Sequence, residues 1–149
     1  MEDFFKNKLP KALENLDENT ERVWGAMSPQ AMVEHLIGTW MISNGRAQVK
    51  FAVPEESLPK RRAFLFSDKE YERGIPNPVF DGKEQPLRKE SLQAAKEQLL
   101  KEVNRFFEHH EENPKVIYTH PVFGDLDYEG WLVFQMKHMG HHMRQFGLL

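Results

Sequence analysis

The chain has 149 residues, no cysteine and a formal net charge of −3. This length favours a single domain over residues 1–149, with a core large enough to fold without cross-links. The charge shows no basic excess that would indicate nucleic acid as a partner. The lack of cysteine excludes disulfides, thiolate metal ligands and cysteine nucleophiles.

The N-terminal residues MEDFFKNKLPKALENL alternate charged and apolar types and lack the apolar centre of a signal peptide. No apolar run approaches the roughly 18 residues that indicate a membrane-spanning helix. We therefore expect a cytoplasmic protein with no membrane partner.

Two stretches in the first third of the chain predict helices. Over residues 3–19 apolar residues recur at helical spacing, and Pro10 indicates either a kink or a new helix start within this stretch. The second stretch has a clear start signal, because Ser28 suits the N-cap and Pro29 suits the first helical position. This helix should end near residues 44–45.

A connection of about 40 residues, 46–85, follows the second predicted helix. It contains four prolines and an Asp81-Gly82 turn signal, and a short helix is expected around residues 64–66. So long an irregular connection is unusual inside a compact domain and is often functional.

The C-terminal half predicts two further helices and one ordered connector. The third helix starts at about residue 86 or 90 and ends at about residue 111, before Asn113-Pro114. Residues 119–124 form the connector, and the fourth helix runs from the N-cap Asp127 to about residue 146. Four helices with one long crossover predict an all-α four-helix bundle.

Histidines cluster near the C-terminus, in the stretch KHMGHH at residues 137–142. On a helical wheel, His138 and His142 fall within the apolar arc, whereas His141 falls at its edge. Side chains at i and i+4 lie on one face with Cβ atoms about 5–6 Å apart. Two imidazoles placed in this way can bind one metal ion, at about 2.0–2.1 Å each.

His35 is the candidate for a third ligand, since it lies on the apolar face of the second predicted helix while Glu34 points away from it. Two facing helices would then present His35, His138 and His142 to a common point, as bundle cores do when they build metal sites. Remaining coordination positions would go to water or substrate. A bare His-x-x-x-His pair or a single apolar-face histidine is also compatible with ordinary core histidines, and this alternative stays open.

Other polar residues have weaker signals. His109 and His110 lie near the end of the third helix and are expected to be solvated, where positive charge suits the helix dipole. His120 is either a structural residue or a group that contacts the substrate or the metal ligands. The remaining candidates are Gln30 and Gln145, which can orient water or ligands, and Lys137 and Arg144, which can meet an anionic substrate at the rim.

Three segments of the sequence resemble the DinB-like superfamily. The stretch WGAMSPQAMVEHL, residues 24–36, is similar to its second-helix signature of a tryptophan, a capped helix start and a histidine. The stretches HPVFGDLDYEGW, residues 120–131, and KHMGHHMRQFG, residues 137–147, are similar to the C-terminal signature of a branch called DUF1569. The resemblance covers almost the whole chain and is poorest over residues 46–85.

The resemblance implies a four-helix bundle of the DinB-like type, often a homodimer, that holds a divalent metal such as zinc or nickel. Carried over by position, the ligands are His35, His138 and His142. Some relatives are transferases or isomerases that use low-molecular-weight thiols. We therefore expect a metal-dependent enzyme, either a transferase with a small thiol substrate or a hydrolase. The alternatives are a non-catalytic metal-binding or structural bundle, and a ligand-binding protein that uses the long connection as a lid.

Overall fold

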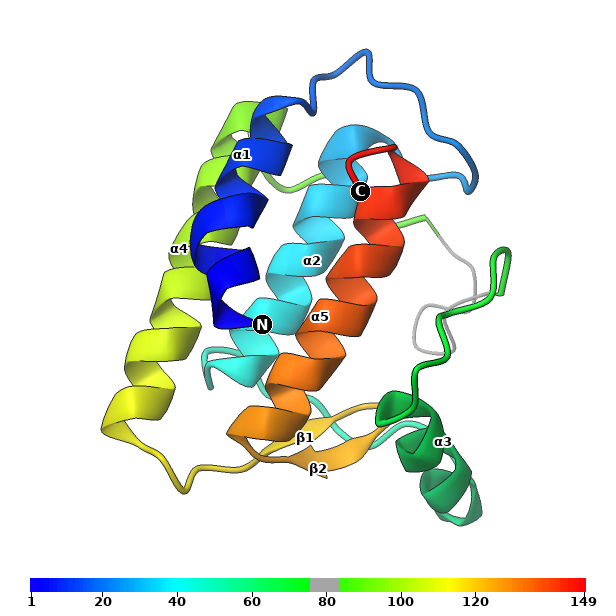
Figure 1. The fold of residues 1–149 in the computed structure, drawn as a ribbon, viewed down its shortest axis with the longest axis vertical. Helices are drawn as coiled ribbons and strands as arrows, with labels where there is room; N and C mark the ends of the chain where they lie inside the picture. The colour runs from blue at the N-terminus through cyan, green and yellow to red at the C-terminus, as the bar shows by residue number, and fades with distance from the viewer. Residues whose placement is uncertain (76–83) are drawn as a thin grey trace.

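Helices dominate the computed structural model, which describes residues 1–75 and 84–149 (Figure 1). A small antiparallel sheet of two strands pairs Thr119 with Asp125. The elements in chain order are η1 (Phe4–Lys8), α1 (Leu9–Glu14), α2 (Pro29–Ser43), η2 (Glu55–Ser57), α3 (Leu58–Leu65), α4 (Leu92–Glu112), β1 (Tyr118–His120), β2 (Gly124–Leu126) and α5 (Tyr128–Gln145).

The N-caps explain where the long helices begin. Ser28 Oγ accepts a hydrogen bond from the backbone N–H of Ala31 at the start of α2. Asp127 does the same for Gly130 at the start of α5, so both predicted starts are confirmed. The third predicted helix, α4, begins at Leu92, because Ser91 is the residue that caps it.

Two expectations need correction. The first predicted helix, over residues 3–19, is instead a π-helical turn, η1, followed by α1, which ends at Glu14 and has Pro10 in its first turn. The connection 46–85 is less irregular than predicted, since η2 and α3 lie within it and α3 contains most of the short helix expected around residues 64–66. The Asp81-Gly82 turn lies outside the described residues.

The chain is mostly helical as predicted, but the β1–β2 hairpin was not predicted. Each strand has only three residues, which is too short for an alternating hydrophobic pattern to appear in the sequence. The hairpin packs across one end of α2 and α5 (Figure 1). The predicted connector at residues 119–124 is therefore part of a small sheet.

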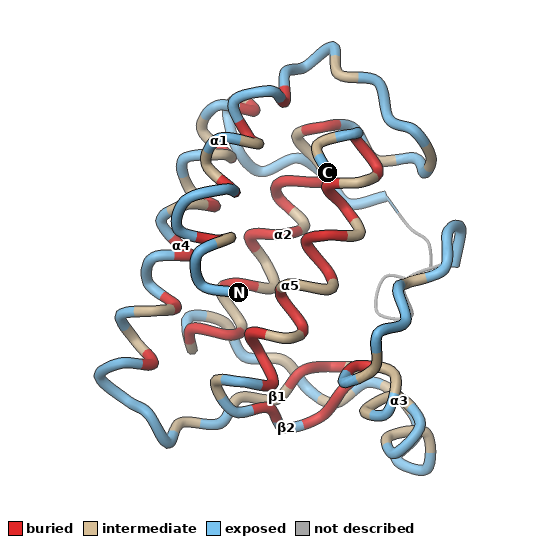
Figure 2. Tube along the Cα trace, in the orientation of Figure 1, coloured by how far each residue is buried: buried red, intermediate tan, exposed pale blue. Residues whose placement is uncertain are grey.

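The core lies between α1, α2, α4 and α5, which run side by side (Figure 1). Rings from η1, α2 and α4 meet edge to face within this core. The Trp40 ring lies 5.0 Å from the Phe5 ring and 5.2 Å from the Phe106 ring. Figure 2 shows the buried residues along the facing sides of α2 and α5 and in the hairpin. The four-helix-bundle topology itself stays a prediction.

A short column of polar side chains crosses the interface between α2 and α5. Gln135 is fully buried, accepts a hydrogen bond from Thr39 Oγ1 at 3.2 Å, and donates one to Ser43 Oγ at 3.2 Å. Thr39 and Ser43 follow His35 by one and two turns of α2, and Gln135 precedes His138 by about one turn of α5. The column therefore sets how the two helices face each other at the level of these histidines.

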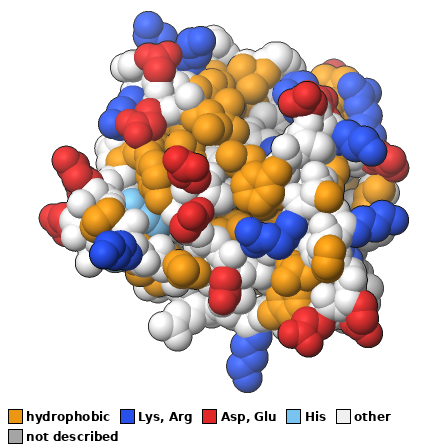
Figure 3. Space-filling model, turned by 60° about the horizontal axis from the view of Figure 1, so that its bottom comes forward, with side chains coloured by type: hydrophobic (Ala, Val, Ile, Leu, Met, Phe, Trp, Pro, Cys, Tyr) orange, Lys and Arg blue, Asp and Glu red, His pale blue; other side chains and the backbone are white. Residues whose placement is uncertain are grey.

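The molecular surface shows no area of a single charge sign on the face drawn in Figure 3. Acidic and basic side chains are interspersed there around hydrophobic patches. Within the described residues, no helix combines the length and the apolar character needed to cross a membrane.

The C-terminal end of α2 is tied to α4 through Glu102, whose side chain is completely buried. Its Oε1 atom accepts hydrogen bonds from Arg46 at 2.6 Å and from Arg105 at 2.8 Å, while Oε2 accepts one from Asn44 at 2.7 Å. Asn44 is the C-cap of α2. One buried carboxylate thus joins the α2 terminus, the turn after it and α4.

We predict that Glu102→Ala lowers the free energy of unfolding by about 2–3 kcal/mol, because Asn44 loses a buried partner and the two arginines lose their shared carboxylate. The loss is limited since Arg46 and Arg105 are both partly exposed to water. Urea denaturation followed by circular dichroism measures the change in the free energy of unfolding. The control Glu108→Ala removes an exposed carboxylate from the same helix and should change stability by less than about 0.5 kcal/mol. Equal effects of the two substitutions would contradict the role of Glu102.

Candidate metal centre

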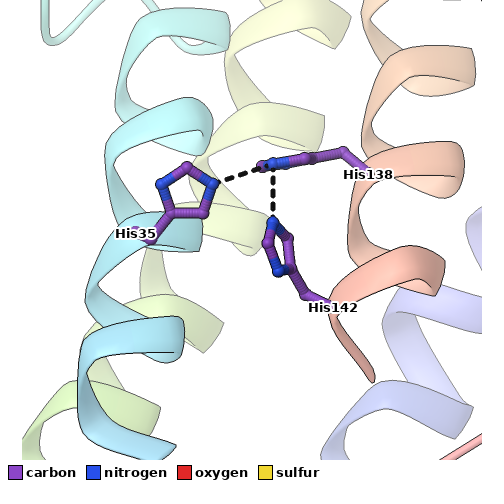
Figure 4. Close-up of side chains that lie close together, drawn as sticks. All are labelled: His35, His138 and His142. Carbon is purple, nitrogen blue, oxygen red and sulfur yellow. Dashed lines mark hydrogen bonds between the residues drawn. The ribbon is translucent and has the colours of Figure 1, made fainter. Parts of the chain in front are cut away.

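Three histidines from α2 and α5 converge on one point (Figure 4). The Nε2 atom of His138 lies 2.9 Å from Nε2 of His35 and 3.0 Å from Nε2 of His142. The ligand atoms of the three residues all lie within 4.8 Å of one another, and no carboxylate belongs to this group in the described part of the chain. These are the three residues that the helical wheel selected, and their metal binding is taken up below as a proposal.

The helix geometry explains the convergence. His138 and His142 are four residues apart on α5, so their rings lie on the same face, with centroids 4.6 Å apart. His35 projects from α2 toward this pair, and its ring centroid lies 4.9 Å from that of His138. His138 and His142 are buried, with 8% and 7% of their surfaces exposed.

The surroundings of the ring nitrogens of His35, His138 and His142, here called the trio, are compatible with a bound cation. The Nδ1 atom of His138 is buried and has no hydrogen-bond partner in the described structure, while its Nε2 faces two other ring nitrogens. A proton on Nε2 leaves a buried lone pair on Nδ1 without a donor. A proton on Nδ1 leaves a buried N–H without an acceptor and turns the Nε2 lone pair toward the other two rings. A divalent cation that accepts the Nε2 lone pairs removes their mutual repulsion.

The electrostatic environment keeps the trio neutral, as metal ligation requires. Burial, reinforced by His141, lowers the pKa of His35 to about 4. Burial, with a contribution from His35, lowers the pKa of His142 to about 3. The pKa of His138 falls well below its ordinary value for the same reason, with the charges of His142 and His35 adding to it. At neutral pH all three rings are therefore uncharged.

The family of the chain was established by comparison with known proteins. Residues 5–146 match the DinB superfamily. The chain belongs to the DinB superfamily. Members of this superfamily generally bind a divalent metal, and the three-histidine cluster is compatible with that property. No match was found among curated proteins or among solved structures. The assignment to the DUF1569 branch stays a prediction.

His120 lies outside the trio of this DinB-superfamily protein but next to one of its rings. Its Nδ1 atom accepts hydrogen bonds from the backbone N–H groups of Val122 and Phe123, at 3.0 and 3.2 Å. Burial lowers its pKa to about 3, so the ring stays neutral with its proton on Nε2. The ring packs 4.3 Å from Phe134, which stacks on His138 at 4.9 Å. His120 therefore shapes the wall behind His138.

His141 also lies outside the trio, at the rim of the site. Its ring packs against Trp24 at 5.7 Å and against Tyr71 at 5.5 Å. Of the three tryptophans, Trp40 and Trp131 are fully buried, whereas Trp24 is partly exposed beside the candidate site.

Residues 67–75, within the long connection that the sequence marked as often functional, lie against α5 beside the trio. The Tyr71 ring lies 6.3 Å from the His138 ring, and burial raises the pKa of the Tyr71 hydroxyl, so it stays protonated. The Arg73 guanidinium lies 3.9 Å above the Trp24 ring. No periodic pattern marks such a segment, because its contacts are made across the fold.

The two rim cations are engaged with this segment. Arg144 Nη2 lies 3.2 Å from Glu70 Oε1, and Lys137 Nζ donates hydrogen bonds to the carbonyl oxygens of Ser67 and Lys69. Arg144 also lies across Gly140, where an added Cβ atom would be 3.3 Å from Nη1. Gly140 therefore accommodates a side chain of its own helix.

Glu34 and Gln30 have structural partners close to the site. Glu34 is buried, and its Oε1 accepts a hydrogen bond from the backbone N–H of Arg88 at 2.6 Å. Gln30 Nε2 donates to Glu34 Oε2 and to the carbonyl of Lys89. Both residues therefore fasten the segment before α4 to α2.

We predict that the metal-free protein loses stability as the pH falls from about 6.5 to about 4. An unfolded histidine binds a proton near pH 6.5, whereas folded His35, His120 and His142 do so only at about 4, 3 and 3. The unfolded state then binds more protons, and each such group lowers the free energy of unfolding by up to about 1.4 kcal/mol per pH unit.

Urea unfolding of chelator-treated protein at a series of pH values measures this slope. The His142→Gln variant should show a shallower slope, because one of the buried groups no longer titrates. A free energy of unfolding that stays constant over this range would contradict the buried, neutral state of these rings.

Proposed function

We propose that this DinB-superfamily chain is a divalent-metal-dependent enzyme in which His35, His138 and His142 hold zinc or nickel. The observation that carries the proposal is the convergence of three Nε2 atoms from two helices, with His138 and His142 both buried. Imidazole suits both metals. A divalent ion held here would act as a Lewis acid and lower the pKa of a thiol or water that binds to it.

The composition of the trio favours catalysis over a purely structural role. Structural zinc sites use four protein ligands, whereas catalytic sites use three and leave a position for substrate or water. Three neutral imidazoles also leave the positive charge of the ion uncompensated, which favours a thiolate or another anion as the substrate group. We therefore infer a transferase that acts on low-molecular-weight thiols, with a hydrolase as the second reaction type.

The residues around the trio would contribute binding and exclusion of water. The Tyr71 ring and the Phe134 ring pack beside His138 and make the surroundings of the trio apolar. The Tyr71 hydroxyl, which stays protonated, is a candidate hydrogen-bond donor to a bound substrate. Arg73, at the rim over the Trp24 ring, would favour a substrate that carries a carboxylate.

One observation favours a second candidate, a metal-binding protein without catalysis. His138 and His142 are almost inaccessible to solvent. In that case metal removal would destabilise the fold and no thiol or ester substrate would turn over. In the enzymatic case the metal-free protein stays folded, with a lower melting temperature and no activity.

We predict that His35→Gln, His138→Gln and His142→Gln each abolish stoichiometric metal binding, because each removes one of three ligands. Metal content after dialysis, measured by elemental analysis, tests this expectation. The matched control is His141→Gln, which changes a neighbouring histidine outside the trio and should keep the metal. Unchanged metal content in all three ligand variants would contradict the site.

Assays of the metal-loaded protein with a panel of small thiols and an electrophilic acceptor, and with hydrolysable esters and amides, separate the reaction types. Turnover that requires both the thiol and the metal supports the transferase. Turnover of ester or amide without thiol supports the hydrolase. The absence of turnover in every assay, with metal bound, would favour the non-catalytic candidate.

A further inference from the structure

Gln145, the last residue of α5, is hydrogen-bonded to one of the proposed metal ligands. Its side chain is buried, with 8% of the residue exposed, and its Oε1 atom lies 2.7 Å from Nδ1 of His142. An amide oxygen can only accept a hydrogen bond, so Nδ1 of His142 must be the donor.

This hydrogen bond determines the chemical state of the opposite ring nitrogen. A neutral imidazole carries one N–H, and with that proton on Nδ1 the Nε2 atom carries a lone pair. Nε2 of His142 is the atom that faces Nε2 of His138 at 3.0 Å. Gln145 thus turns the lone pair of His142 toward the centre of the trio.

The loop before α2 lies against Gln145 and bonds to its backbone. The backbone N–H of Val23 donates a hydrogen bond to the carbonyl oxygen of Gln145 at 2.6 Å. Gly25 has a positive φ of 90°, and a Cβ atom at this position would lie 2.9 Å from Nε2 of Gln145. Arg22 Nε donates to the carbonyl of Gly25 at 2.8 Å and stabilises this turn. The glycine therefore leaves room for the Gln145 amide beside this turn.

We propose that Gln145 is a positioning residue of the metal site, which fixes the tautomer and orientation of His142 and thereby raises metal affinity. The proposal rests on the proposed metal binding at the trio. Removal of a group that accepts the second N–H of a metal-bound histidine typically lowers the metal affinity 10–100-fold.

The first test compares zinc affinities by competition with a chromophoric chelator. Gln145→Met keeps the length of the side chain but cannot accept a hydrogen bond, and we expect it to bind zinc about 10–100-fold more weakly than the wild type. Gln145→Glu keeps an acceptor at the same position and should retain most of the affinity. The control Gln98→Met makes the same change at a partly buried glutamine of α4 that bonds to Glu102, and it should leave zinc affinity unchanged.

A second measurement reads the tautomer directly. The ¹⁵N chemical shifts of the His142 ring in metal-free protein should show the proton on Nδ1 in the wild type and in Gln145→Glu. In Gln145→Met they should move toward the Nε2–H form. A role in folding alone would lower the melting temperature without moving these shifts.

The outcomes separate this proposal from the proposed function. If the wild type binds no zinc, both the proposed metal site and the positioning role of Gln145 are wrong. If the wild type binds zinc and Gln145→Met binds it equally well, the positioning role is wrong while the metal site stands. If Gln145→Met does not fold, Gln145→Glu decides, because loss of zinc affinity in a folded variant that keeps the acceptor would overturn the positioning role.

Discussion

The relative placement of α2 and α5 is the constraint on which the candidate site depends. His35 and His138 are 103 residues apart in sequence, yet their Nε2 atoms lie 2.9 Å apart. Gln135 bridges the same two helices from within the core, through Thr39 and Ser43. An apolar interface alone tolerates rotation of one helix against the other, whereas a buried amide with fixed partners allows one arrangement. The polar column and the histidines therefore act as one unit, and a small rotation of α5 would separate the proposed ligands.

The site places several polar rings where water is excluded, which is unfavourable without compensation. The compensation differs from ring to ring. His120 accepts from two backbone N–H groups, and His142 donates to Gln145. His138 has no such partner for Nδ1 within the described residues, so part of the free-energy cost of burying this ring stays uncompensated. A local conflict of this kind is expected at functional sites.

Much of the site could be predicted from the sequence because its signals are local. Ser28 and Asp127 mark helix starts through hydrogen bonds to nearby backbone groups, and the helical repeat then placed His35, His138 and His142 on inward faces. The particular contacts of residues 67–75 could not be predicted, since Tyr71 and Arg73 meet α5 and Trp24 only in the folded chain. His110 was expected to be solvated, and that expectation was wrong. Its Nε2–H donates to the carbonyl of Ser43 at 2.8 Å and the ring is buried, a contact between α4 and α2 that no local pattern reveals.

The most direct test of the three-histidine centre is X-ray absorption spectroscopy at the metal edge of the zinc- or nickel-loaded protein. We expect scattering from three imidazole rings, with metal–nitrogen distances of about 2.0–2.1 Å for zinc, together with at least one oxygen ligand from solvent. Loss of one imidazole in the His35→Gln protein would link the α2 contribution to the same ion. A spectrum dominated by carboxylate or water oxygens, with fewer than three imidazoles in the wild type, would contradict a metal centre at the junction of α2 and α5.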